Sequence, residues 1–78
     1  MLKLPKLDIR IIIRLDSLIT LEMTGSPKEL ASKLSITERS VYNYIAFMKQ
    51  ELKAPIKYNY QRTSYLYFED WDFKFNEK

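Results

Sequence analysis

The sequence predicts a mixed α+β fold, in which a three-helix bundle is followed by a β-hairpin and a short C-terminal strand. Apolar residues recur with helical spacing from about residue 7 to residue 52. After Pro55 they alternate with polar residues, which is the spacing of half-buried strands. The chain has 78 residues and no tract that resembles a linker, so we expect a single domain over residues 1–78.

The first helix is expected over residues 7–24, after a disordered arm at residues 1–6. Its apolar face consists of Ile11, Ile12, Leu15, Leu18 and Ile19 together with Glu22. Ile13 and Leu21 fall at the edge of that face, where they would meet either a second chain or the C-terminal segment. Gly25, the only glycine, is expected to end this helix in the left-handed conformation.

Two shorter helices are expected within residues 26–53. Ser26 and Glu29 have the spacing of a capping box, with Pro27 at the first helical position. Thr37 is a suitable N-cap for the next helix. Its apolar stripe is predicted to be Val41, Ile45, Met48 and Leu52. Two helices joined by so tight a turn form a helix-turn-helix.

The hairpin is expected over residues 55–68. Ile56, Tyr58 and Tyr60 alternate with polar residues, residues 61–64 form the predicted turn, and residues 65–68 return as the second strand. Residues 70–78 are expected to add a third strand or a tail.

The amino-acid composition excludes several classes of function. The chain has no cysteine and no histidine, which excludes disulfides and both thiol and imidazole catalysis. We expect no enzyme activity, no metal and no cofactor. The net charge is +3, of which residues 69–78 carry −2, so the first 68 residues carry +5. This excess of positive charge over the first 68 residues favours a phosphate-bearing partner. No apolar run spans a membrane and no signal peptide is evident, so we expect a cytoplasmic protein.

The segments Glu29-Leu30-Ala31, Ile36 to Tyr42, Pro55 to Tyr58 and Ser64 to Tyr67 resemble a winged helix-turn-helix domain. Over about residues 10 to 68 the chain is similar to the DNA-binding domains of the bacterial biotin repressor and deoxyribose-operon repressor type. Ser35 stands where that family usually has glycine, which implies a left-handed serine in the turn.

The resemblance implies that the third helix lies in the major groove of double-stranded DNA and contacts base edges. The residues that it assigns to base contacts are Glu38, Arg39, Ser40, Tyr42 and Asn43. Arg39 is suited to guanine and Asn43 to adenine. Of Tyr42 and Tyr44, one is expected to pack beneath the hairpin and the other, Tyr42, to face outward. Each of these polar side chains is equally compatible with an ordinary solvent-exposed helix face.

Phosphate contacts, which position a protein on DNA without selecting a sequence, are assigned to a second set of residues. They are Ser26, Lys28, Lys49, Lys53, Lys57 and Arg62. Solubilising surface charge is the alternative role for these cations.

The aromatic hairpin has two interpretations. Tyr58, Tyr65 and Tyr67 cover the open side of the helices, or the strands stack unpaired bases as some RNA-binding sheets do. Core packing is preferred. An exposed apolar patch is then expected, and it predicts a homodimer interface. Its members are Leu66, Phe68, Trp71, Phe73 and Phe75.

The function predicted from the sequence is sequence-specific binding of double-stranded DNA by a transcriptional regulator that recognises palindromic sites as a homodimer. The alternative is a protein–protein interaction module with the same fold and no useful DNA affinity. No small-molecule ligand or membrane contact is expected.

Overall fold

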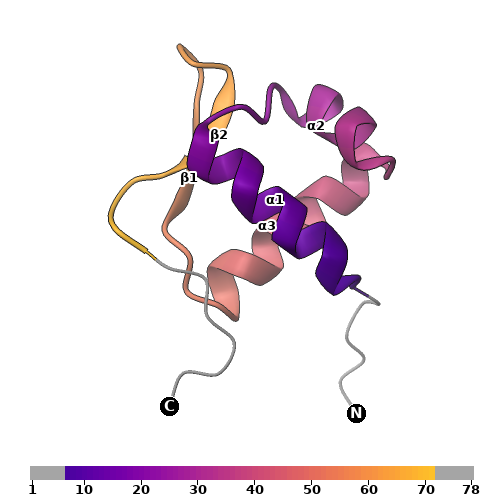
Figure 1. Ribbon diagram of the computed structural model, residues 1–78, viewed down its shortest axis with the longest axis horizontal. Coiled ribbons are helices and arrows are strands. Elements are labelled where there is room, and N and C mark those ends of the chain that lie inside the picture. Colours follow the sequence, from indigo (N-terminus) through magenta and orange to yellow (C-terminus); the bar gives the residue numbers. More distant parts are fainter. Residues whose placement is uncertain (1–6, 72–78) are drawn as a thin grey trace.

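The computed structural model describes residues 7–71 of the chain. The order of its elements is α1 (Ile9–Leu21), α2 (Pro27–Leu34), α3 (Glu38–Gln50), β1 (Ile56–Asn59) and β2 (Ser64–Tyr67). Three helices are therefore followed by a two-stranded antiparallel hairpin (Figure 1). This is the α+β, winged-helix-like architecture that the sequence predicts.

The first helix is shorter than the predicted range 7–24. It begins after Asp8, because the Asp8 carboxylate accepts the N–H of Arg10 at 2.9 Å and caps the first turn. It ends at Leu21, because Glu22 adopts φ 57° and the N–H of Met23 donates to the Leu18 carbonyl. Gly25 also has a positive φ, but it lies beyond the helix end, so its predicted role as the helix terminator is wrong.

The two ends of α2 follow the sequence closely. Ser26 and Glu29 form both hydrogen bonds of the capping box, with Pro27 in the first turn. Ser35 ends the helix at φ 58°, which is the left-handed serine that the departure from glycine implied. The helix that follows, α3, is capped by Thr37, whose hydroxyl oxygen accepts the N–H of Ser40 at 3.0 Å.

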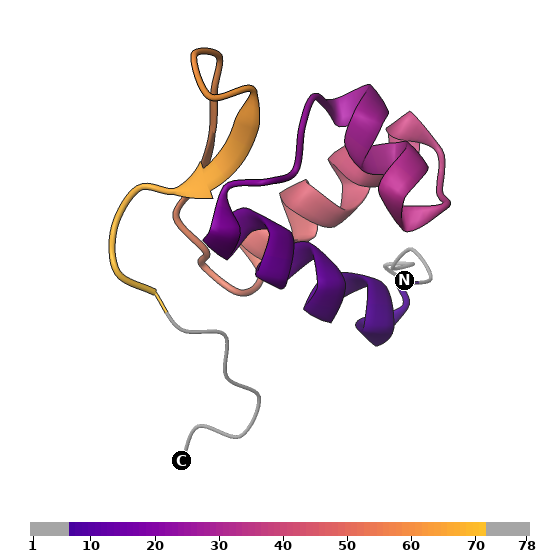
Figure 2. The ribbon, with the colours of Figure 1, turned by 45° about the horizontal axis from the view of Figure 1, so that its top comes forward.

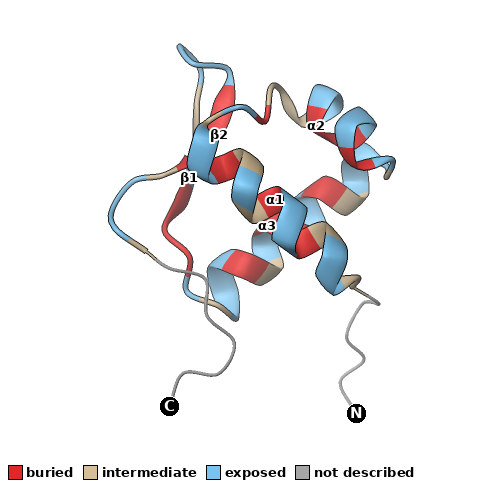
Figure 3. Cartoon of the chain, in the orientation of Figure 1, coloured by how far each residue is buried: buried red, intermediate tan, exposed pale blue. Residues whose placement is uncertain are grey.

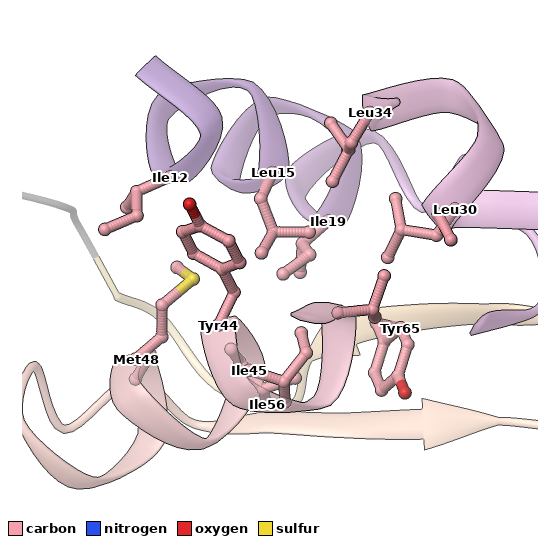
Figure 4. Packing of buried hydrophobic residues seen from close by; sticks show 13 residues of the cluster. Ile12, Leu15, Ile19, Leu30, Leu34, Tyr44, Ile45, Met48, Ile56 and Tyr65 are labelled. Atoms are coloured by element: carbon pink, nitrogen blue, oxygen red, sulfur yellow. The ribbon is translucent and has the colours of Figure 1, made fainter. Parts of the chain in front are cut away.

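The core lies where the inner sides of α1, α2 and α3 meet the hairpin (Figure 3). Ile12, Leu15 and Ile19 of α1 are buried in it. Tyr44 of α3 points toward α1 in Figure 4, and its hydroxyl accepts the N–H of Asp8 at 2.9 Å. Burial of apolar side chains such as these stabilises the fold by about 25 cal/mol for each Å² of apolar surface removed from water.

The hairpin pairs Ile56 with Tyr67 and Asn59 with Ser64. Ser64 therefore belongs to β2, and the turn consists of residues 60–63 rather than the predicted 61–64. Asp70 and Trp71, the described part of the predicted C-terminal strand, form no strand, and residues 72–78 lie outside the described range.

The inner edge of β2 is joined to the segment that connects α1 with α2. The Thr24 N–H donates to the Ser64 hydroxyl at 3.1 Å, and the Tyr65 N–H donates to the Thr24 hydroxyl at 2.9 Å. Both hydroxyl residues are fully buried. As a result β2 lies between β1 and the Thr24 segment, and Ser64, Tyr65 and Leu66 of β2 are all buried.

Candidate nucleic-acid interface

The outward side of α3 carries a stripe of exposed, mostly polar residues. Val41, Ile45 and Met48 are buried on the inner side, as predicted, and Leu52 beyond the helix is half-buried. The residues on the opposite side recur at intervals of four, three and four positions and are all exposed. They are Arg39, Asn43, Ala46 and Gln50. We call these four residues the α3 stripe.

Arg39 and Asn43 project freely from the α3 stripe. Neither side chain makes a hydrogen bond or ion pair with any other residue in the range 7–71. A guanidinium with all of its donors available and an amide with both donor and acceptor available are the groups that bind guanine and adenine edges.

Glu38 and Tyr42 form a second row on the flank of α3. The Tyr42 hydroxyl donates to the Glu38 carboxylate at 3.2 Å. Burial, followed by this hydrogen bond, raises the pKa of Tyr42. Tyr42 is half exposed while Tyr44 is buried, so Tyr42 is the tyrosine that faces outward, as predicted.

Three tyrosines of the hairpin lie beside this flank of α3, and together with Tyr42 they form what we call the tyrosine cluster. They are Tyr58, Tyr60 and Tyr65. The Tyr58 ring makes edge contacts with the rings of Tyr60 and Tyr65, at centroid distances of 4.9 and 5.0 Å. Tyr65 belongs to the core, and burial raises its pKa to about 12. Tyr60, in contrast, is 85% exposed, so the prediction that it continues the strand is wrong.

The cations assigned to phosphate contacts fall into two groups. The side chains of Lys28, Lys49, Lys53 and Lys57 lie at exposed positions. Arg62 instead forms an ion pair with Glu22 at 3.0 Å, which ties the hairpin turn to the end of α1. Arg62 must leave this pair before it can neutralise a phosphate.

Two serines are less available than the sequence suggested. The Ser26 N–H is bonded to the Glu29 carboxylate, so only the hydroxyl proton remains for a phosphate. Ser40 is half-buried, and its hydroxyl oxygen accepts from the Thr37 hydroxyl at 3.0 Å. Because Ser40 also lies on the flank of α3 away from Tyr42, it is the weakest of the predicted base contacts.

The predicted dimer patch is only partly exposed. Leu66 is buried, with 9% of its surface accessible. Phe68 is exposed, while Trp71 is half-buried with its ring 4.9 Å from that of Tyr67. Phe73 and Phe75 lie outside the described residues.

The sequence prediction missed Gln50 and Ala46, which complete the α3 stripe. Extension of the spacing from Arg39 and Asn43 by three and then four residues would have found both. The exposure of Tyr60 could not be found in this way, because strand alternation assigns it to the buried face.

No family model, no curated protein and no solved structure matches this chain. Within the described range, no helix is both long enough and apolar enough to cross a bilayer.

Proposed function

We propose that this protein is a winged helix-turn-helix regulator of transcription that binds double-stranded DNA through the α3 stripe and catalyses no reaction. The observation that carries the proposal is the free state of Arg39 and Asn43 on the outward side of a rigidly packed helix. A regulator of this kind acts in the cytoplasm, where bacterial DNA lies.

The packing behind α3 supports this proposal. Tyr44 and Met48 are buried against α1 and the rest of the core, so the helix axis is held firmly. A fixed helix presents its outward side chains with little loss of conformational entropy on binding, which favours specificity.

Roles can be assigned within the interface. Arg39 donates two hydrogen bonds to a guanine, and Asn43 pairs with a neighbouring adenine. Lys49 at the end of α3, Lys53 in the connection after it and Lys57 in β1 contact phosphates. Glu38, held by Tyr42, accepts from a cytosine amino group and disfavours other bases at that position.

The test is a titration of labelled random and selected duplexes at several salt concentrations, measured by fluorescence anisotropy. We expect the logarithm of affinity to fall linearly with the logarithm of salt concentration, with a slope of about −0.9 for each neutralised phosphate. Lys53→Ala should reduce the slope by about one unit on every sequence.

Arg39→Ala should weaken the selected site by about 1–3 kcal/mol and relax the preference at one base pair. Arg10→Ala is the control, because Arg10 is also exposed but lies on α1, away from the α3 stripe. Unchanged affinity and preference in Arg39→Ala would show that α3 does not contact the bases.

A protein–protein interaction module is the second candidate. It is favoured by Tyr60 and Tyr42, which expose aromatic surface beside the carboxylate of Glu38, a combination that repels phosphates yet suits a protein partner. Absence of DNA binding at low salt would select this candidate.

A further inference from the structure

The α3 stripe has one apolar member, Ala46, which lies between Asn43 and Gln50. Ala46 is exposed, whereas the other two alanines of the chain, Ala31 and Ala54, are buried in the core. The surface that we propose to meet base edges therefore carries one small apolar group among polar side chains.

The helical repeat fixes the direction of the Ala46 methyl group. At about 100° for each residue, Ala46 lies within about 60° of both Arg39 and Asn43 around the axis of α3. The buried Val41 and Met48 lie on the other side of that axis. An alanine has no side-chain rotamers, so its methyl group points in the direction in which the stripe faces.

The exposed surface of α3 suits a helix that lies along a groove. The stripe continues from Arg39 in the first turn to Gln50 at the last residue of the helix. Two exposed cations accompany its far end, Lys49 in the last turn and Lys53 in the connection to β1. A duplex whose phosphates contact these lysines extends past Ala46.

We propose that Ala46 contacts the C5-methyl group of a thymine in the base pair next to the adenine that Asn43 binds. This inference rests on the proposed function. Ala46 lies about 4.5 Å beyond Asn43 along the helix axis, close to the rise of about 3.4 Å from one base pair to the next. Arg39 lies about 6 Å to the other side of Asn43. The adenine is therefore expected between the guanine pair and the thymine pair.

Thymine fits this position better than the other bases. Of the four bases it alone presents a methyl group in the major groove, and alanine is a suitable apolar partner for that group. Contact between the two methyl groups removes apolar surface from water on both molecules. Against another base, the Ala46 methyl covers hydrogen-bonding groups without offering them a partner, which is unfavourable.

The test uses selected duplexes in which each thymine in turn is replaced by uracil, which differs from thymine only in the absent methyl group. Affinities of the wild type and of Ala46→Gly are measured by fluorescence anisotropy. We expect one uracil, beside the adenine, to weaken binding of the wild type about fourfold, the effect of one buried methyl group. In Ala46→Gly the same uracil should change the affinity by less than about twofold.

Glycine loosens a helix, but the thymine and uracil duplexes are compared on the same variant, so a general loss of helix stability cancels from the ratio. Lys49→Gly is the matched control, because it places glycine at another exposed position of α3. It should weaken both duplexes alike and keep the ratio of the wild type.

Two results would overturn the proposal. In the first, the wild type binds the thymine and uracil duplexes equally at every position. In the second, Ala46→Gly retains the full effect of the uracil. Both results leave the proposed DNA binding intact, whereas failure of the wild type to bind any duplex would overturn the proposed function itself.

Discussion

At the scale of single residues, Thr24 and Ser64 hold the hairpin onto the helices. Their hydroxyls lie 3.1 Å apart, and both residues are fully buried. The Thr24 hydroxyl oxygen accepts a hydrogen bond from the Tyr65 N–H. The Ser64 hydroxyl oxygen accepts from the Thr24 N–H, and the same hydroxyl donates to the Tyr65 carbonyl. Two side chains therefore do what a third strand would do by backbone pairing.

Thr24→Val should destabilise the protein by about 1–3 kcal/mol, because the methyl group that replaces the hydroxyl leaves the buried Tyr65 N–H without an acceptor. Urea denaturation followed by far-ultraviolet circular dichroism measures the change. Ser32→Ala, which removes an exposed hydroxyl from α2, is the control and should change stability by less than about 0.5 kcal/mol. An equal effect of the two substitutions would contradict the role of Thr24.

The hairpin tyrosines give the protein a pH dependence at the alkaline end. Burial raises the pKa of Tyr65 from 10.0 to about 12. It also raises the pKa of Tyr67, as does, to a smaller extent, the hydrogen bond from the Tyr67 hydroxyl to Asp16. At a pH between the tyrosine pKa in the unfolded chain and the raised pKa in the folded chain, the unfolded chain has released the hydroxyl proton and the folded chain still holds it. The free energy of unfolding therefore falls as pH rises through this window, and the contribution is fully present below it.

We expect the double variant Tyr65→Phe/Tyr67→Phe to lose less stability than the wild type between about pH 9 and about pH 11. Urea denaturation at the two pH values gives the comparison. Tyr60→Phe removes a hydroxyl from an exposed ring and is the control. If the stability of the double variant falls with pH as steeply as that of the wild type, other groups cause the loss of stability at alkaline pH.

At the scale of elements, left-handed residues end the first two helices. Glu22 ends α1 and Ser35 ends α2, at φ 57° and 58°. After Ser35 the N–H of Ile36 donates to the Ala31 carbonyl at 3.0 Å, which closes the turn and directs the chain into α3. The angle between α2 and α3 therefore depends on a conformation that a serine side chain disfavours.

Ser35→Gly should raise the free energy of unfolding by roughly 0.5–1 kcal/mol, because glycine reaches the left-handed region without steric strain. The matched substitution Ser32→Gly lies inside α2 and should lower it by about 0.5 kcal/mol. Thermal or urea denaturation of the two variants tests the opposite signs. Destabilisation by both substitutions would mean that strain at Ser35 is negligible.

At the scale of the whole molecule, α1 and α3 have outward sides that face away from each other. Both views show α1 in front of α3 (Figures 1 and 2). The buried side of α3 faces α1, since the Tyr44 hydroxyl accepts from Asp8. The α3 stripe therefore lies on the opposite side of the molecule from the exposed residues of α1.

The local signals in the sequence determined much of the fold. The Ser26 capping box, the Thr37 cap and the change from helical to alternating spacing at Pro55 are short-range features, so they are visible without coordinates. The inner face of α3 was predictable for the same reason, and with it the outward position of Arg39 and Asn43.

Only the tertiary structure decided which surfaces remain free. Leu66 is buried in the folded chain, β2 is bonded to the Thr24 segment, and Arg62 is engaged because the hairpin turn lies beside Glu22. Each of these contacts joins residues about 40 positions apart in the chain. The periodicity of a sequence carries information about neighbours within a turn or a strand, whereas such distant pairs meet only after the helices and the hairpin have packed together.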